Sequence, residues 1–337
     1  MEPNKTTTAP LINLSQKLDG TEDTAAFARH VAEGLSQTQK TLLSRYFYDG
    51  QGSRLFQQIM ELPEYYLTRC EFEVLQTHKQ AIAAHFSDPG FFHLVDLGAG
   101  DALKTKILLQ ELTQSQKGFD YVPVDISGDA MQQLRGTLQK EMPLLEVQAV
   151  VGEYFSALDW MHQHKPDRKV VLFLGSNIGN FKEAESQNFL RSVRRYLKAG
   201  DKLLLGVDLR KDPETVLKAY SDASGVTAAF NLNLLTRINR ELGGNFNLEQ
   251  FRHYALYNPQ DGVMRSFLVS KIEQEVHIGA LQQSYHFDAW ETIHTENSHK
   301  YTLPQVEALA SASGFKVEKV FQDKQCRFAD VLLTVAS

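Results

Sequence analysis

An alternation of strand-like and helix-like segments between residues 94 and 207 constrains the fold of this chain most strongly. Strands of apolar residues separate segments with helical periodicity, and such alternation predicts a parallel sheet with helices on both faces. Ligands of these sheets bind beyond the carboxyl ends of the strands. The expected strands are 94–97, 120–125, 145–151, 169–175 and 202–207, and the expected helices lie near 104–113, 128–140 and 183–197.

The loop after the first strand, within Leu94–Thr105, is suited to holding a ligand. Gly98 and Gly100 can adopt backbone angles that a Cβ forbids, and they let a ligand approach the main chain. A dinucleotide-binding turn requires a third small residue, but Leu103 stands there. Asp125 follows the next strand, near the offset of ~20 residues at which an acid binds ribose hydroxyls. The turn and this acid favour S-adenosylmethionine, although many ordinary loops also contain a Gly-x-Gly pair.

Two more loops follow strands of the same sheet. Glu153 and Tyr154 come after the third strand, and the run Gly175-Ser-Asn-Ile-Gly-Asn180 comes after the fourth. We expect both loops to face the same crevice as the glycine turn. A plain turn is the alternative for residues 175–180, because Asn and Gly are common in turns.

Composition narrows the class of protein. The 337 residues carry a formal net charge of -6, which gives no general reason to approach nucleic acid or an anionic membrane. Cys70 and Cys326 are the only cysteines, so neither a disulfide framework nor a Cys-rich zinc site is expected. His162 and His164 lack a third ligand at a familiar spacing, and we expect no metal. Without an apolar leader or a membrane span, we expect a cytoplasmic, soluble protein. We also expect a monomer.

The segments outside the alternating region predict a second, α+β lobe and a tail. We expect residues 1–20 to form a flexible tail, residues 70–210 and 301–337 to form the α/β domain, and residues 21–69 and 211–300 to form the lobe. Within the lobe, residues 25–35 and 211–241 have helical patterns, and 251–278 alternates like antiparallel strands. Residues 293–301 are a polar run that would be unusual as a core strand.

Capping residues mark three helix starts. Ser53 is expected to cap a short helix that ends at Pro63, and Thr68 with Glu71 matches a capping box for a helix reaching about residue 86. Thr302 with Gln305 matches a second capping box. Strands at 316–321 and 329–335 then return the chain to the sheet.

Four tyrosines lie close together in the sequence before the glycine turn: Tyr46, Tyr48, Tyr65 and Tyr66. One interpretation is that they pack a lid against the core with their hydroxyls toward water. The other is that they bind a polar substrate beside the nucleotide. The residue pattern alone leaves both open.

Several motifs in one order give the chain a family resemblance. The segments 46–71, 96–105, 173–180, 220–231 and 296–301 resemble the histidine-specific S-adenosylmethionine-dependent methyltransferases over roughly residues 24–335. The resemblance implies a Rossmann-like class I methyltransferase sheet with an added substrate lobe. It also implies trimethylation of the α-amine of L-histidine to hercynine, the first step of ergothioneine biosynthesis.

The resemblance also implies roles for individual residues. For the methyl donor, the implied contacts are Gly98, Lys104, Asp125, Glu153 and Tyr154, where Glu153-Tyr154 replaces an Asp-Phe pair of the family. For the amino acid, they are Tyr65, Gly175, Asn180, Tyr220, Glu296 and Ser298. Tyr48 is placed near the amine, and Ser266 stands where a methionine lies beside the imidazole ring. Glu296 would accept a hydrogen bond from one ring nitrogen, and Ser298 would donate to or accept from the other.

Three other functions remain as alternatives. The same fold and donor can serve another aromatic amino acid or small amine, since Ser266 alters the side-chain pocket. A non-enzymatic sensor of S-adenosylmethionine is a second alternative, although it would not need the polar residues Tyr48, Asn180, Tyr220 and Glu296. A nucleic-acid methyltransferase is disfavoured by the acidic balance.

Overall fold

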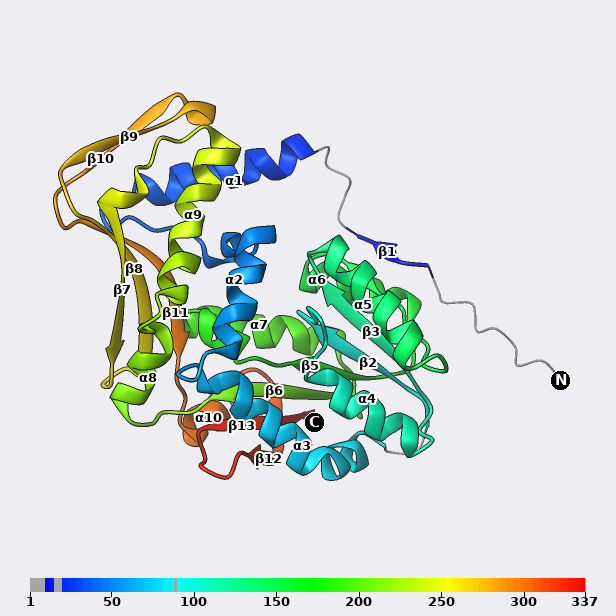
Figure 1. The fold of residues 1–337 in the computed structure, drawn as a ribbon. Coiled ribbons are helices and arrows are strands. Elements are labelled where there is room, and N and C mark those ends of the chain that lie inside the picture. Colours follow the sequence, from blue (N-terminus) through cyan, green and yellow to red (C-terminus); the bar gives the residue numbers. More distant parts are fainter. Residues whose placement is uncertain (1–9, 15–19, 88–89, 337) are drawn as a thin grey trace. The chain divides into compact units, whose positions relative to one another are not determined.

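The computed structural model describes residues 10–14, 20–87 and 90–336, and it divides the chain into two compact units. The first unit comprises residues 1–16, 69–209 and 301–337. The second comprises residues 17–68 and 210–300. Each unit is therefore built from segments that are far apart in the sequence (Figure 1).

The first unit contains an eight-stranded sheet in the order β1-β4-β3-β2-β5-β6-β13-β12. Neighbouring strands are parallel except that β13 is antiparallel to both β6 and β12. The strand order reverses between β2 and β5, which creates the switch point where ligands of such sheets bind. The strands are β1 (Ile12–Asn13), β2 (Phe92–Leu97), β3 (Phe119–Asp125), β4 (Val150–Val151), β5 (Arg168–Phe173), β6 (Lys202–Asp208), β12 (Phe315–Gln322) and β13 (Phe328–Val335).

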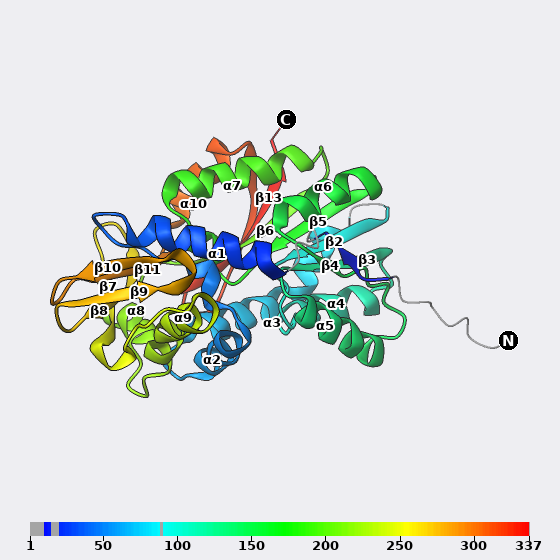
Figure 2. The same cartoon turned by 90° about the horizontal axis from the view of Figure 1, so that it is seen from above.

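Helices cover both faces of this sheet, as Figure 2 shows from above. Successive residues of β2, Leu94 and Val95, point into opposite core layers, and both are fully buried. Burial on both faces explains why these strands are continuous apolar runs. One face is covered by α3 (Tyr66–Phe86, from residue 69 onward in this unit), α4 (Thr105–Gln114) and α5 (Gly128–Glu141); the other is covered by α6 (Tyr154–His164), α7 (Glu183–Tyr196) and α10 (Leu303–Ala312).

The second unit is a small α+β structure. Its three-stranded antiparallel sheet has the order β11-β8-β7, and β9 pairs with β10 in a separate hairpin. Helices α2 and α9 lie side by side, and α9 also packs on the sheet (Figure 1). The elements are α1 (Gly20–Leu35), α2 (Gly50–Glu61), α8 (Pro213–Tyr220), α9 (Val226–Leu242), β7 (Phe251–Asn258), β8 (Val263–Ser270), β9 (Gln274–Ile278), β10 (Gln283–Phe287) and β11 (Thr292–His299). Short 3₁₀ helices are η1 (Ser44–Phe47), η2 (Asn177–Asn180, in the first unit), η3 (Leu248–Gln250) and η4 (Gly279–Leu281).

The predicted fold class is confirmed, and so is the capping box of α10. The Gln305 N–H donates to Thr302 Oγ1 at 3.4 Å, and the Thr302 N–H donates to Gln305 Oε1 at 2.9 Å. The predicted strand 145–151 is shorter than expected, because only residues 150–151 form β4. Val147 makes just an isolated bridge to Tyr121.

Two predicted helix starts are wrong. Asp49, not Ser53, caps α2, because its carboxylate accepts the Gly52 N–H at 2.7 Å. Helix α3 begins at Tyr66, so Thr68 lies inside the helix and makes no capping box with Glu71. Glu71 is instead turned into the interior.

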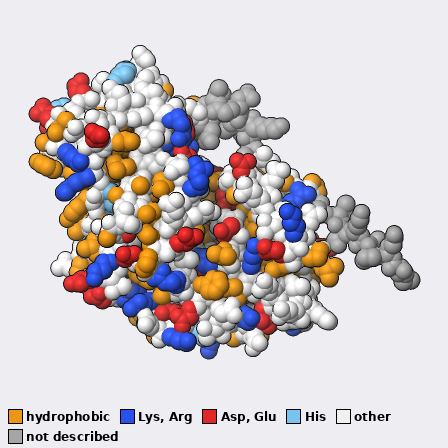
Figure 3. Space-filling model, viewed as in Figure 1, with side chains coloured by type: hydrophobic (Ala, Val, Ile, Leu, Met, Phe, Trp, Pro, Cys, Tyr) orange, Lys and Arg blue, Asp and Glu red, His pale blue; other side chains and the backbone are white. Residues whose placement is uncertain are grey.

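The predicted tail is also wrong at two points, since Ile12–Asn13 form β1 and pair with β4, and helix α1 begins at Gly20. The rest of that prediction, at residues 1–9 and 15–19, lies outside the described residues. No helix in the described ranges combines the length and apolar character needed to cross a membrane. On the face drawn in Figure 3, basic and acidic side chains are interspersed rather than gathered by sign.

Candidate active site

The turn after β2 brings Gly98 and Tyr154 into contact. Gly98 has φ +78°, and a Cβ at this position would lie 3.0 Å from the Tyr154 hydroxyl. A side chain would therefore be strained by its backbone angle and would fill the space beside the turn. The Tyr154 ring packs edge-on against Phe173 with centroids 5.6 Å apart. Burial raises the pKa of Tyr154, so its hydroxyl stays neutral.

Asp125 closes the same turn from the end of β3. Its Oδ2 accepts the Gly100 N–H at 3.1 Å, and its Oδ1 accepts the Ser127 N–H at 2.9 Å. Burial raises the pKa of Asp125, and these backbone bonds oppose the rise. The carboxylate is thus fixed in direction at the carboxyl end of the sheet, as a group that binds ribose hydroxyls must be.

Lys104 and Gly175 meet at a residue that the sequence patterns did not single out as functional. Glu71 is 1% exposed, and its side chain forms an ion pair with Lys104 Nζ. Its second oxygen accepts the Gly175 N–H at 2.6 Å. Glu71 therefore joins the turn before α4 to the loop after β5, on either side of the strand-order reversal.

Gly206 on β6 provides the space for Glu71, because a Cβ at position 206 would overlap the Glu71 carboxylate. Asp330 on β13 lies directly opposite Gly206 in the strand register and is fully buried. Neither Asp330 oxygen has a hydrogen-bond partner among the described residues. Burial, followed by the repulsion of Glu71, raises the pKa of Asp330 well above its usual value. Burial beside the Glu71–Lys104 pair therefore favours the protonated form of Asp330.

Asn177 lies between the two glycine loops. Its Nδ2 is 3.6 Å from a Cβ built at Gly98 and 3.7 Å from one built at Gly175. Glu153 is exposed just before α6, and Asn180 is half-buried at the end of η2. The structure thus gathers Gly98, Lys104, Tyr154 and Gly175 around Glu71 and Asn177, with Asp125 bound to the same turn.

In the second unit, residues 293–299 of the polar run lie in strand β11, and alternation puts Glu296 and Ser298 on one face. The register shifts between His294 and Glu296, which marks a bulge at Thr295. Thr295 Oγ1 anchors this bulge through Asn231 Oδ1 at 3.0 Å and the Ser266 carbonyl at 3.1 Å. Bulges of this kind re-aim side chains beside binding sites.

Ser266 is opposite Glu296 in the β8–β11 pairing, so both side chains share a face. Burial raises the pKa of Glu296 to about 7, and the positive charge of Lys300 limits the rise. Glu296 is therefore poised to change its charge near neutral pH. The ionised form accepts hydrogen bonds at both oxygens, whereas the protonated form has an O–H donor and a weaker, uncharged acceptor.

The remaining predicted residues of the second unit form an aromatic wall. Tyr48 is 40% exposed and lies edge-on to Phe56 and Phe230, with centroids 5.4 and 5.7 Å apart. Tyr65 is buried and lies 6.2 Å from the Tyr220 ring. The ring of Tyr48 packs on a cluster of aromatic side chains and is partly exposed, whereas Tyr65 is buried within that cluster.

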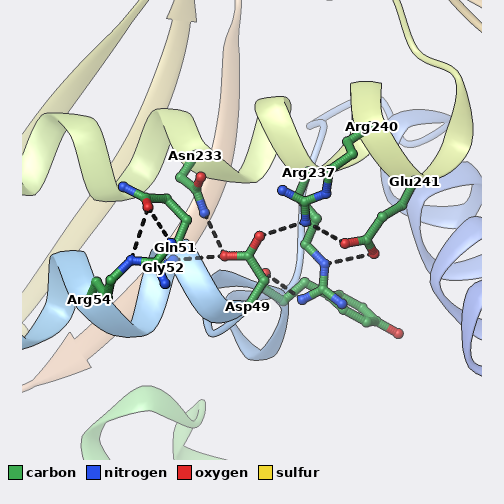
Figure 4. A network of polar contacts seen from close by, with 9 residues as sticks. Asp49, Gln51, Gly52, Arg54, Asn233, Arg237, Arg240 and Glu241 are labelled. Carbon is green, nitrogen blue, oxygen red and sulfur yellow. Dashed lines mark hydrogen bonds and ion pairs between the residues drawn. The ribbon is translucent and has the colours of Figure 1, made fainter.

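A polar network fixes the backbone next to Tyr48 (Figure 4). The Asp49 carboxylate accepts bonds from Asn233 Nδ2 at 2.8 Å and from Arg240 at 2.6 Å, and both donors lie on α9. Together with the cap on Gly52, these bonds keep the pKa of Asp49 below its usual value despite burial. The network ties the start of α2 to α9.

The sheet order, the glycine turn at the switch point and the acid at the end of β3 define a Rossmann-like S-adenosylmethionine-dependent methyltransferase. A sequence model of histidine-specific, S-adenosylmethionine-dependent methyltransferases matches residues 27–335. The chain belongs to this family.

Curated relatives agree with this assignment. Histidine N-alpha-methyltransferase of Mycolicibacterium smegmatis is 36% identical over 306 residues, which are 90% of this chain and 94% of that protein. The protein of the same name from Mycobacterium tuberculosis is 37% identical over 289 residues, 86% of this chain and 88% of that protein. Ergothioneine biosynthesis protein 1 of Neurospora crassa is 31% identical over 276 residues, 80% of this chain and 30% of that protein.

Proposed function

We propose that this protein transfers methyl groups from S-adenosylmethionine to the α-amine of L-histidine, three in succession, to give hercynine. The observation that carries the substrate assignment is the face of β11 on which Glu296 and Ser298 stand two residues apart, about 7 Å along a strand. A carboxylate and a hydroxyl at this spacing match the two nitrogen atoms of an imidazole. Family membership and the curated relatives support the same assignment.

The first unit has a turn that fits the methyl donor, since Gly98 leaves open the space that a Cβ would fill. When bound, S-adenosylmethionine supplies an electrophilic methyl group on a sulfonium. Asp125 would bind the ribose hydroxyls, Lys104 would bind the donor's carboxylate, and Glu153 and Tyr154 would bind the adenine. Glu71 would hold Lys104 in the orientation that this contact needs.

The remaining predicted residues would bind histidine. Glu296 and Ser298 would bind the ring, and Tyr65, Tyr220, Gly175 and Asn180 would bind the carboxylate and the amine. Methyl transfer forms a C–N bond as a C–S bond breaks, so the protein mainly has to align a neutral amine. Tyr48 would accept a hydrogen bond from that amine while water removes the proton.

Product analysis tests the reaction. The protein is incubated with a methyl-labelled donor and each free amino acid in turn, and the products are identified by mass spectrometry. Histidine should acquire three labelled methyl groups and the other amino acids none. Methylation of a different aromatic amino acid or amine would support the alternative that Ser266 suggests, and donor binding without turnover would support a sensor.

Two single substitutions test the residue roles. Tyr48→Phe should slow the first two methylations, because the neutral amine then still has an N–H to donate, and unchanged rates of all three methylations would remove Tyr48 from the orientation of the amine. Glu296→Ala should weaken histidine binding and spare donor binding, and equal loss of both by calorimetry would contradict the assignment.

We also propose that the enzyme acts as a monomer in the cytoplasm on a free amino acid. The net charge of -6, together with the interspersed charges on the face drawn in Figure 3, supports a small-molecule substrate over nucleic acid or a membrane. Neither Cys70 nor Cys326 forms a disulfide within the described residues, which suits a reducing compartment. Light scattering of the purified protein and fractionation of its host test the two statements.

A further inference from the structure

Lys300 is a buried cation that forms a closed triangle with two hydroxyl groups. It is 1% exposed, and its Nζ lies 2.8 Å from the Tyr220 hydroxyl and 2.7 Å from Ser298 Oγ. The two hydroxyl oxygens are themselves 2.8 Å apart. Nζ also lies 4.6 Å from the centroid of the Tyr220 ring, a cation–π distance.

The numbers of hydrogen-bond donors and acceptors in this triangle determine the direction of the Ser298 hydroxyl. An ammonium group has only donors, so both oxygens accept from Lys300. The bond between Tyr220 and Ser298 holds one hydrogen, and the phenol supplies it because a phenol is a stronger acid than an alkyl alcohol. Ser298 Oγ then accepts two bonds, which fill its acceptor positions. Its own hydrogen has to point out of the triangle.

We propose that Lys300 is a positioning residue that, with Tyr220, makes Ser298 an obligate hydrogen-bond donor, so that the site selects the neutral imidazole tautomer whose bare nitrogen faces Ser298. This inference rests on the proposed function. It adds to that function the direction of the Ser298 bond and a role for Lys300. A ring that presents N–H to Ser298 meets a second donor and is rejected.

Selection by a fixed donor explains what the site would discriminate against. An imidazolium carries N–H on both ring nitrogens, and one of them would face the Ser298 hydrogen with the Lys300 charge behind it. Indole and phenol rings have no bare nitrogen to accept the Ser298 bond. A buried donor left unpaired reduces binding about tenfold or more, so each of these ligands is disfavoured.

Two pyrrolylalanines test the donor direction, because each replaces one imidazole nitrogen by C–H and keeps one N–H. One isomer presents its N–H to Glu296, and the other presents it to Ser298. Binding is measured by calorimetry at pH 8, where the histidine ring is neutral and most of Glu296, whose pKa is about 7, is ionised, as the binding scheme requires. The wild type should prefer the first isomer about tenfold or more.

Lys300→Met is the main variant, and Tyr220→Phe is the second. Either change frees one acceptor position on Ser298, so the disfavoured isomer should gain affinity and the ratio should fall toward one. A general structural defect would weaken both isomers and leave the ratio unchanged. If Lys300→Met does not fold, Tyr220→Phe still tests the inference. Any direct contact of Tyr220 with the amino-acid group would affect the binding of both isomers equally and leave their ratio unchanged.

Ser298→Ala provides the third arm. It should weaken histidine binding about tenfold but strengthen binding of the isomer with C–H toward Ser298, because alanine removes the donor that this isomer leaves unpaired. An unchanged isomer ratio in Lys300→Met and Tyr220→Phe, or equal losses for histidine and that isomer in Ser298→Ala, would overturn the inference. If the wild type failed to bind or methylate histidine at all, the proposed function would fail instead.

Discussion

The carboxylate of Glu71 lies against the α-carbon of Gly206, in a space that a Cβ at position 206 would occupy. The same Cβ would lie 3.1 Å from the Leu174 Cα and 3.2 Å from the Gly175 nitrogen, so it also meets backbone that has little room to move. A glycine in the middle of a buried strand otherwise weakens it. At β6, therefore, the missing side chain is what permits a buried carboxylate to bridge Lys104 and Gly175.

Gly206→Ala should destabilise the protein and weaken donor binding. Overpacking of a buried site reduces the free energy of unfolding by about 1–3 kcal/mol, and the displaced Glu71 would no longer orient Lys104. Gly136 in α5 is the matched control, because a Cβ added at position 136 would meet no described atom within 4 Å beyond its own stretch of helix. Gly136→Ala should raise the free energy of unfolding by about 0.5–1 kcal/mol. Urea unfolding and titration with S-adenosylhomocysteine measure both effects; similar stabilities for the two variants would contradict this packing argument.

Glu71→Gln should leave the shape of the site intact and remove its anchor for Lys104. Hydrogen bonds to charged groups contribute about 1.5–3 kcal/mol, so affinity for S-adenosylhomocysteine should fall about tenfold or more. Glu141→Gln is the control, since Glu141 pairs with Lys106 at 2.8 Å but is 49% exposed. That exposed pair contributes about 0–1 kcal/mol, and its loss should not change donor affinity. Equal donor affinities in the two variants would show that Glu71 does not orient Lys104.

The sequence patterns located the parts of the site that depend on local structure. Gly98 and Asp125 each stand at the end of a strand buried on both faces, so an apolar run followed by a turn or an acid is enough to predict their positions. The prediction that Glu71 completes a capping box failed because its position depends on contacts distant in the sequence. Thr68 and Glu71 fit a capping box, and only contacts with Lys104 and Gly175, 33 and 104 residues away, give Glu71 its actual position.

Lys300 was missed in the same way as Glu71. The alternation of β11, continued one residue past His299, puts position 300 on the face of Glu296 and Ser298, and this is the signal that could have found it. Its partner Tyr220 is 80 residues earlier in the chain, however, and no local pattern links the two. Asn177 stood inside a predicted loop, but its position between Gly98 and Gly175 depends on the neighbouring strands β2 and β5.

Asp96→Asn should change how stability depends on pH. Thr105 and Tyr121 both donate to Asp96 Oδ2, at 2.7 and 2.8 Å, and an asparagine oxygen can accept the same two bonds. Burial raises the pKa of Asp96 to about 6, whereas it is about 3.9 in an unfolded chain. The folded state therefore binds this proton more tightly, and the free energy of unfolding falls as pH rises from about 4 to about 6.

The decrease attributable to Asp96 is about 3 kcal/mol, because one unit of pKa corresponds to about 1.4 kcal/mol. Asparagine does not titrate, so the variant should lose this part of the decline. Urea unfolding of both proteins at several pH values from 4.5 to 8 gives the comparison. Parallel stability curves would mean that Asp96 carries no raised pKa.

Asp49→Asn should loosen the segment that carries Tyr48 (Figure 4). The change keeps an oxygen for the Gly52 N–H but removes the charge that binds Arg240, so we expect a stability loss of about 1 kcal/mol. Because Tyr48 is the adjacent residue, kcat should fall more than the histidine KM changes. Arg54→Gln, also on α2, removes only exposed bonds to Gln51 and should change neither quantity. An unchanged kcat in Asp49→Asn would show that the polar network around Asp49 does not position Tyr48.

Histidine binding should weaken as pH falls through 7, because Glu296 then gains a proton. Its pKa is raised to about 7, and the protonated carboxyl has no charge, so it accepts an N–H more weakly than the carboxylate does. Below that pH the ionised fraction falls about tenfold per unit, and the KM for histidine should rise in proportion. Glu296→Gln has an oxygen that accepts at every pH, so its KM should be higher at pH 8 but less dependent on pH. Histidine's own ring and amine titrate identically with both enzymes, and the ratio of the two KM values therefore isolates Glu296. The donor KM depends on the first unit and should be the same in both proteins. If the ratio of the two histidine KM values stayed constant between pH 6 and 8.5, a titrating Glu296 would have no part in ring recognition.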